Sequence, residues 1–136
     1  MTPEFDRSLS AYADLIVRVG LNLRAGQRLL IRAPLETAPL ARHIAARAYD
    51  HGARLVEAIY SDPHLQLTRF QHAPADSFEE HSTWPVTAGL EYVEAGHATL
   101  SITGTDPDLF KDVDPARIMT VRRAEGRVAA PLSRLI

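Results

Sequence analysis

Four aspartates lie within fifteen residues in the segment GTDPDLFKDVDPARI, which covers 104–118. They are Asp106, Asp108, Asp112 and Asp114. Carboxylates at such close spacing bind calcium in EF-hand loops, whose pattern is D-x-[DN]-x-[DN]-G. Here Phe110 and Lys111 occupy the last two of these positions, so the calcium pattern fails.

An Asp-Pro pair occurs three times, beginning at Asp62, Asp106 and Asp114. An aspartate at a helix start accepts hydrogen bonds from the first free backbone N–H groups, and proline suits the next position because it lacks an N–H. Each pair also precedes a segment with helical character. We therefore favour helix capping for these aspartates over a metal site, which stays the alternative.

Hydrophobic periodicity predicts the elements that position these residues. Apolar residues recur at helical spacing over 4–19, and the apolar run at 28–33 predicts a buried strand. Thr37 is the expected cap of a second helix that ends near residue 50. The other expected elements are strands at 53–60 and 98–104, and helices beginning near 62, running from about 84 to 95, and running from 115 to about 130, where Pro131 interrupts.

The first two strands are separated by one helix and short loops. This βαβ order implies parallel strands joined by a right-handed crossover. We therefore predict a three-layer α/β fold with a short, mostly parallel sheet of at least three strands, flanked by helices. A chain of 136 residues is long enough to bury one core, so we treat residues 1–136 as a single domain.

The loops that follow the predicted strands carry polar side chains. Ligands of open parallel sheets bind beyond the carboxyl ends of the strands, which predicts a polar crevice there. Its candidate residues are Glu36, Asp62, His64, Thr105 and Asp106, with Thr103 beside them. Polar loops at strand ends are also ordinary, so both interpretations stay open. Asp62 and His64 are the nearest approach to a ligand pair, whereas a metal site needs three or four ligands.

Composition and motifs exclude several classes of function. The net charge of −2 gives no basic surface for nucleic acid, and the chain has no cysteine for disulfides or thiolate chemistry. No H-E-x-x-H, G-x-S-x-G or P-loop pattern occurs. His43 and His51, eight residues apart on the second helix, are interpreted as exposed polar-face residues. With no signal peptide and no long apolar run, we expect a cytoplasmic protein.

Several segments resemble the M29 family of thermophilic metalloaminopeptidases, of the aminopeptidase T and aminopeptidase S type. They are VGLNLRAGQRLLIRAP at 19–34, AYDHGARLVE at 48–57, SDP at 61–63 and SITGTDPDLFKDVDPARI at 101–118. The resemblance runs from about residue 9 to the end and is to the N-terminal domain of these enzymes.

The resemblance implies a two-domain enzyme that removes N-terminal residues from peptides. Its C-terminal domain would hold two divalent metals, zinc or cobalt, which activate water. No position here matches those ligands, so the resemblance implies no catalytic residue, no metal ligand and no cofactor in this chain. The apolar ending LSRLI agrees with a chain that stops before that domain.

The leading hypothesis is therefore the N-terminal domain of a metal-dependent aminopeptidase, inactive alone, which shapes the substrate cavity and helps assembly. The implied partners are the absent C-terminal catalytic domain, peptide substrate in the full-length enzyme and a second copy in a homodimer, with no nucleic acid and no membrane. The alternative is a stand-alone α/β module that binds a small ligand or dimerises.

Overall fold

The computed structural model describes residues 2–104 and 106–135, which divide into two compact units. The first unit comprises the described residues up to Ser61 together with Tyr92–Thr103. The second comprises Asp62–Glu91 and the described residues from Gly104 onward.

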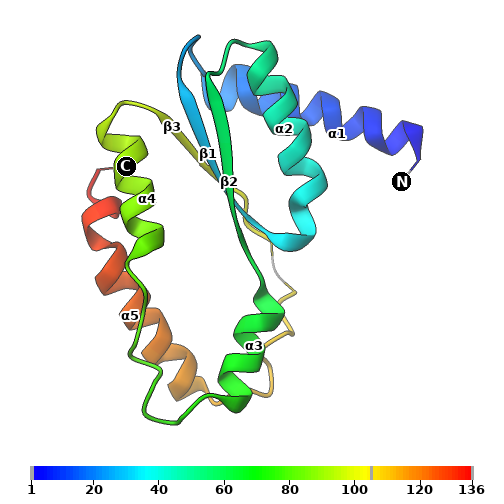
Figure 1. Ribbon diagram of the computed structural model, residues 1–136. Coiled ribbons are helices and arrows are strands. Elements are labelled where there is room, and N and C mark those ends of the chain that lie inside the picture. Colours follow the sequence, from blue (N-terminus) through cyan, green and yellow to red (C-terminus); the bar gives the residue numbers. More distant parts are fainter. Residues whose placement is uncertain (1, 105, 136) are drawn as a thin grey trace. The chain divides into compact units, whose positions relative to one another are not determined.

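The first unit contains the β-sheet (Figure 1). Three parallel strands lie in the order β2-β1-β3, so β1 is central and pairs with both neighbours. The predicted α/β class with a short parallel sheet flanked by helices is thus confirmed. The elements are α1 (Pro3–Leu15), the π-helix η1 (Ile16–Gly20), β1 (Arg28–Pro34), the 3-10 helix η2 (Leu35–Thr37), α2 (Ala38–Asp50), β2 (Leu55–Ser61) and β3 (Ala98–Ser101).

The core of the first unit lies between the sheet and the two long helices. Alternate residues of β1 point to one face because side chains of a strand alternate between the two faces. Leu29 and Ile31 on that face pack with Ala13 of α1 and with Ile44 and Ala48 of α2, all at most 1% exposed. The small alanines let the helices approach the strands closely, so α1 and α2 cover one face of the sheet.

The position of β2 at the edge of the sheet explains why this strand can contain a charged residue. Glu57 pairs with Leu30 of the central strand, but β2 itself lies at the edge of the sheet, and Glu57 is exposed. Its carboxylate accepts a hydrogen bond from the hydroxyl of Tyr92, which is 5% exposed. The sheet therefore accommodates the charge at its edge, where one oxygen is hydrogen-bonded and water reaches the residue.

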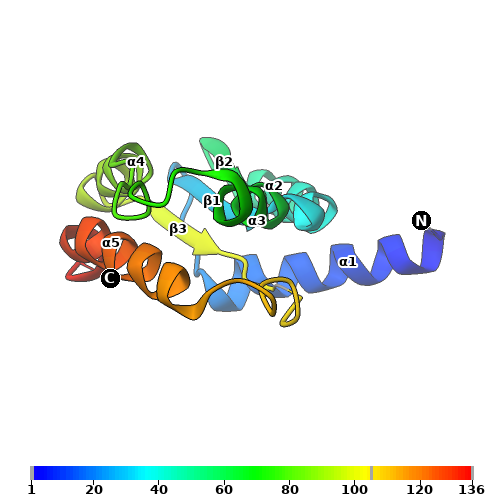
Figure 2. The same cartoon turned by 90° about the horizontal axis from the view of Figure 1, so that it is seen from below.

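The first helix departs from its predicted form. The pattern over 4–19 predicts one continuous helix, but α1 ends at Leu15 and a π-helix follows. The N–H of Leu21 donates to the carbonyl of Ile16 at 2.9 Å, which closes a turn one residue wider than an α-turn. Val17 stays in the core through this turn at 1% exposure. The N-terminal turns of α1 extend beyond α2 (Figure 2).

Three other element predictions need correction. Thr37 does not cap α2, because its hydroxyl donates to the carbonyl of Pro34 at 2.7 Å within η2. The third strand is shorter than 98–104 and ends at Ser101. The last helix does not stop at Pro131, which lies near its C-terminal end, where the lost N–H removes only one hydrogen bond.

The second unit has a small aromatic core. It contains α3 (Pro63–His72), α5 (Pro115–Ser133) and α4 (Trp84–Glu94) as far as Glu91. Phe70 and Phe78 stack with centroids 5.9 Å apart, and Phe110 meets Phe70 edge to face at 5.4 Å. The guanidinium groups of Arg69 and Arg117 lie 5.7 and 5.1 Å from the Phe78 ring, which favours cation–π attraction.

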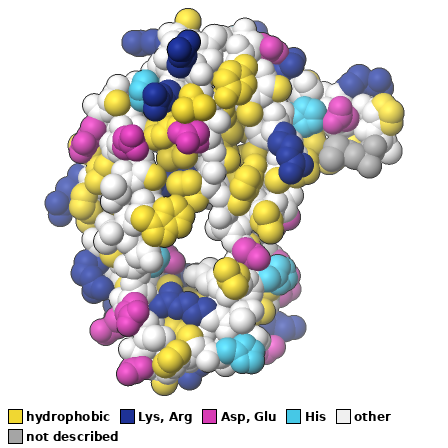
Figure 3. Space-filling model, viewed as in Figure 1, with side chains coloured by type: hydrophobic (Ala, Val, Ile, Leu, Met, Phe, Trp, Pro, Cys, Tyr) yellow, Lys and Arg dark blue, Asp and Glu magenta, His cyan; other side chains and the backbone are white. Residues whose placement is uncertain are grey.

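The described surface mixes charged and apolar side chains. On the face in Figure 3, hydrophobic side chains reach the surface over the sheet of the first unit. Tyr49 and Tyr60 are among the large hydrophobic residues of that unit with high exposure, 48% and 41%. Of the helices that the structure describes, none is both long enough and apolar enough to cross a membrane.

Candidate functional site

The predicted crevice residues are distributed over both units. Glu36 lies in η2, directly after β1 in the first unit, and is exposed. Asp62, His64 and Asp106 belong to the second unit and are exposed too. Thr105 lies outside the described residues. A shared polar crevice therefore stays a prediction.

Hydrogen bonds show what the aspartates of the Asp-Pro pairs do. Asp62 caps α3, where one carboxylate oxygen accepts from the N–H groups of His64 at 3.0 Å and Leu65 at 3.3 Å. Asp114 caps α5 by accepting from the N–H of Ala116 at 2.9 Å. The capping prediction is confirmed at these two positions.

The Asp106 carboxylate also accepts a hydrogen bond from a backbone N–H, but it does so in a turn and not at the start of a helix. Its carboxylate accepts from the N–H of Asp108 at 2.9 Å, but turns rather than a helix follow it. This is an Asx-turn, the arrangement in which a short side chain bonds the backbone two residues on. The segment after Asp106 thus forms turns, and its carboxylate satisfies a local backbone donor without capping a helix.

Asp62 and His64, the nearest approach to a ligand pair in the sequence, do not form a metal-binding arrangement. Asp62 and His64 are joined through the backbone N–H of His64 and not through its ring. Within 2–104 and 106–135, no group of three or more histidine, aspartate or glutamate side chains can hold a metal ion. Zinc sites use three or four protein ligands, so these residues do not fit zinc.

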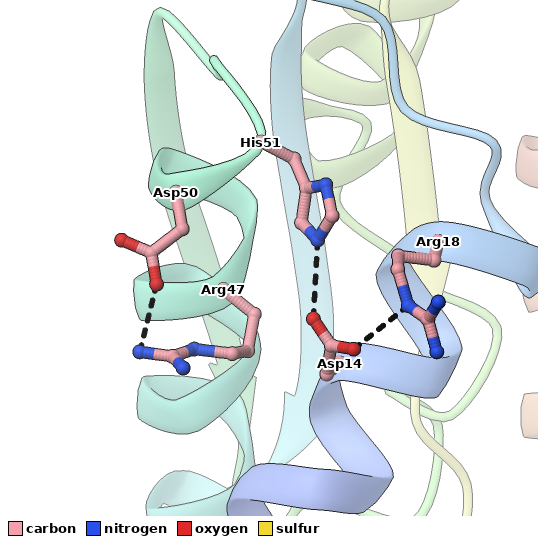
Figure 4. Close-up of polar contacts among 5 residues, drawn as sticks. All are labelled: Asp14, Arg18, Arg47, Asp50 and His51. Atoms are coloured by element: carbon pink, nitrogen blue, oxygen red, sulfur yellow. Dashed lines mark hydrogen bonds and ion pairs between the residues drawn. The ribbon is translucent and has the colours of Figure 1, made fainter.

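A polar cluster absent from the predicted site joins α1 to α2 (Figure 4). Nε2 of His51 lies 3.1 Å from Oδ1 of Asp14, and Nε of Arg18 donates to the other carboxylate oxygen at 2.8 Å. The hydrogen bond from His51 lowers the pKa of the Asp14 carboxyl below its ordinary value; partial desolvation opposes this, and the positive charge of Arg18 adds to it. On α2 itself, Arg47 and Asp50 form a separate ion pair of 2.8 Å.

A second histidine–aspartate pair joins the same two helices, nearer to the N-terminus of each. Nε2 of His43 lies 2.8 Å from Oδ1 of Asp6. Both histidines are half-buried and bonded to α1, so their interpretation as exposed polar-face residues was wrong. The signal was present in the sequence, because Asp6 and Asp14 have the same eight-residue spacing as His43 and His51. Each pair offers only two ligand groups, so its role is to join the helices.

One cavity lies within the second unit. It encloses about 760 Å³ and is lined by Arg69, Arg127 and the loop residues Glu79, Glu80 and His81. Its arginines already have partners. Arg69 donates to the carbonyls of Ser77 and Glu80 at 3.0 Å each, and Arg127 donates to Glu79 at 3.4 Å. These hydrogen bonds tie the loop to α3 and α5 within the second unit.

Comparisons with known proteins identify the family. The model of the thermophilic metalloprotease family M29 matches residues 5–136. Aminopeptidase 2 of Geobacillus stearothermophilus is 43% identical over 126 residues, which are 93% of this chain and 30% of that protein. Aminopeptidase T of Thermus thermophilus is 32% identical over 127 residues, 93% of this chain and 31% of that protein.

A solved structure agrees in fold and in extent. Wild-type AmpT from Thermus thermophilus superposes with a TM-score of 0.89 at 32% identity, over 93% of this chain and 32% of that one. The chain thus spans about a third of the length of the curated relatives it matches. With a family match that covers nearly all of its residues, this chain belongs to the thermophilic metalloprotease family M29.

Proposed function

We propose that this chain is the N-terminal domain of a metal-dependent aminopeptidase, which removes N-terminal residues from peptides. The observation that carries the proposal is the family match over 5–136, combined with relatives named aminopeptidases that are about three times as long. In this proposal residues 1–136 form one α/β domain of a cytoplasmic enzyme, and the C-terminal catalytic domain is the remaining part.

The chemistry of the reaction belongs to that remaining part. The donor groups of the described residues do not fit a metal ion, so no catalytic step is assigned to this chain. In the whole enzyme, two zinc or cobalt ions would supply activated water and would polarise the peptide carbonyl. The N-terminal domain would shape the substrate cavity and support assembly of a homodimer.

An activity measurement tests the proposed division of labour. The purified 136-residue chain should not hydrolyse amino-acid anilides, with or without added zinc or cobalt. A preparation of a full-length relative, assayed in the same buffer, serves as the positive control. Robust hydrolysis by this chain would place catalytic groups within it and would overturn the proposed role.

Metal retention gives a second test that does not depend on turnover. The chain is incubated with zinc or cobalt, desalted, and analysed for bound metal. We expect no retained equivalent, because Asp62 uses its carboxylate as a helix cap and Asp106 uses its own in a turn. Retention of one or two equivalents that is lost in Asp62→Ala or Asp106→Ala would contradict this expectation.

A second proposal is that the chain is a small-ligand-binding or dimerisation module. An apolar cavity at the carboxyl end of β3 favours the ligand-binding form. The polar crevice predicted from Glu36, Asp62, His64, Thr105 and Asp106 stays a separate proposal, because the described residues among these do not line that cavity. A saturable rise in melting temperature with ligand would support binding, and a monomer at high concentration in light scattering would count against dimerisation.

A further inference from the structure

A cavity of about 400 Å³ opens at the carboxyl end of β3, within the first unit. Its walls come from three parts of the chain: α1 with η1 and the residue after it, the first turn of α2, and the end of β3. The apolar walls are Tyr12, Ile16, Leu21, Leu40, Leu100 and Ile102. Five of these, Ile16, Leu21, Leu40, Leu100 and Ile102, also pack against the main core, so the cavity walls continue into that core.

The cavity lies where the strand order of the sheet changes direction. From β1 the chain passes through α2 to β2 on one side, whereas β3 lies on the other side of β1. The strand order therefore changes direction between β1 and β3. Open parallel sheets bind ligands at such a switch point, beyond the carboxyl ends of the strands. Leu40, in the first turn of α2, and the end of β3 both line the cavity.

The π-helix forms one wall of the cavity. The bond from the N–H of Leu21 to the carbonyl of Ile16 joins two cavity residues across the widened turn. Gly20 also lines the cavity, and no atom would lie within 4 Å of a Cβ added there, other than its chain neighbours and its own helix backbone. Single π-turns occur often at functional sites because they re-aim side chains that an α-helix would place elsewhere.

The lining defines the chemistry of an occupant. None of the described residues that line the cavity carries a charge, so a charged group would lose its water without gaining a partner among them. Tyr12, Ser101 and Thr103 bring hydroxyl groups to the same lining. The volume falls within the range of pockets that hold small molecules, roughly 300–1,000 Å³.

We propose that this cavity, at the switch point between β1 and β3, binds a small, neutral, mainly apolar molecule that carries one hydrogen-bonding group. The apolar part contacts the aliphatic walls, and the polar end meets the hydroxyl groups of Tyr12, Ser101 or Thr103. The site requires no metal and no residue outside the first unit. It does not depend on the proposed peptidase function, which the anilide assay tests separately.

A matched pair of probes tests the proposal on the 136-residue chain. Amide ¹H–¹⁵N spectra are recorded during titration with 1-hexanol and, separately, with hexanoate, which has the same carbon chain but carries a charge. We expect saturable shifts with hexanol, confined to the cavity residues near 12–21, 40 and 100–103. Hexanoate should give no saturable shift there. Equal binding of both probes, or hexanol shifts spread evenly over the chain, would overturn the proposal.

Two glycine variants decide whether the cavity itself holds the probe. Gly20→Leu adds a side chain at a cavity residue where a Cβ meets open space, and it should weaken hexanol binding at least tenfold. Gly126→Leu makes the same change at a helical glycine of α5, also open, and should leave the affinity unchanged. Unchanged affinity in Gly20→Leu would remove the assignment.

The hydroxyl contribution has its own variants. Tyr12 is 56% exposed, so Tyr12→Phe should fold normally and weaken hexanol binding by roughly three- to tenfold, the effect of one lost hydrogen bond. Tyr60→Phe on β2, where the tyrosine is 41% exposed and does not line the cavity, is the control. If Tyr12→Phe binds as tightly as the parent chain, Tyr12 does not hold the polar end and that assignment fails.

Discussion

Nε2 of His51 in α2 lies 3.1 Å from Oδ1 of Asp14 in α1, although 37 residues separate them in the sequence. The other oxygen of Asp14 accepts a hydrogen bond from Arg18, so one carboxylate binds both His51 and Arg18. Together with the Asp6 and His43 pair, this contact fixes how α1 lies along α2. The apolar core beneath supplies most of the stability, because exposed polar pairs contribute little.

Removal of the Asp14 carboxylate should have an effect that depends on pH. The folded-state pKa of Asp14 is lowered, chiefly by the hydrogen bond from His51, so ionised Asp14 stabilises the fold above its ordinary pKa of 3.8. That contribution falls as the pH drops through 3.8 and is gone below the folded pKa. Urea unfolding of Asp14→Asn and the parent chain should therefore differ at neutral pH and converge in acid. Asp112→Asn, an exposed carboxylate, is the control, and a difference that persists in acid would contradict the assignment.

Loss of the α5 cap should destabilise the chain moderately. Asp114→Ala leaves the N–H of Ala116 without its side-chain acceptor and should cost about 1 kcal/mol of unfolding free energy. Denaturant unfolding monitored by circular dichroism measures this cost. Asp112→Ala, two residues earlier and outside the helix, should change stability much less. Equal costs in the two variants would show that capping is not the role of Asp114.

Alanine substitutions at two glycines with positive φ distinguish the stability cost of backbone strain from the cost of a steric contact. Gly96→Ala, at φ 78°, meets no neighbour within 4 Å and should cost about 1–2 kcal/mol through the left-handed conformation alone. Gly52→Ala, at φ 96°, would also place its Cβ 3.0 Å from that of Ala25 and should cost more. Thermal unfolding of both variants gives the comparison. A smaller loss in Gly52→Ala than in Gly96→Ala would contradict the packing of Gly52 against Ala25.

Arg69 should control the mobility of the loop over 73–83. One nitrogen of its guanidinium donates to the carbonyls of Ser77 and Glu80, and the group lies against the Phe78 ring. Arg69→Lys keeps the charge but loses this planar geometry. We expect faster hydrogen exchange across the loop, measured by mass spectrometry, with little change in α1 and α2. Arg122→Lys on the exposed surface of α5 is the control, and unchanged loop exchange in Arg69→Lys would refute this role.

The local pattern of the sequence determined the fold class and the ends of several elements. Apolar runs and one intervening helix were enough to predict parallel strands, since a short βαβ unit has few alternatives. The Asp-Pro pairs at Asp62 and Asp114 predicted two helix starts correctly, because capping depends on neighbours only two or three residues away. The resemblance to the M29 family also came from the sequence, and the family match agrees with it.

Tertiary structure alone decided the features that depend on distant segments. The pairing of Asp14 with His51 requires α1 and α2 to pack on the same face of the sheet, which no local pattern specifies. The cavity combines the π-turn at Ile16 with the end of β3, about 85 residues later in the sequence. Thr37 failed as a cap for a local reason instead, because its hydroxyl donates to the carbonyl of Pro34, three residues earlier. Short-range preferences set the elements, and contacts between distant elements set the site, because those contacts exist only after packing.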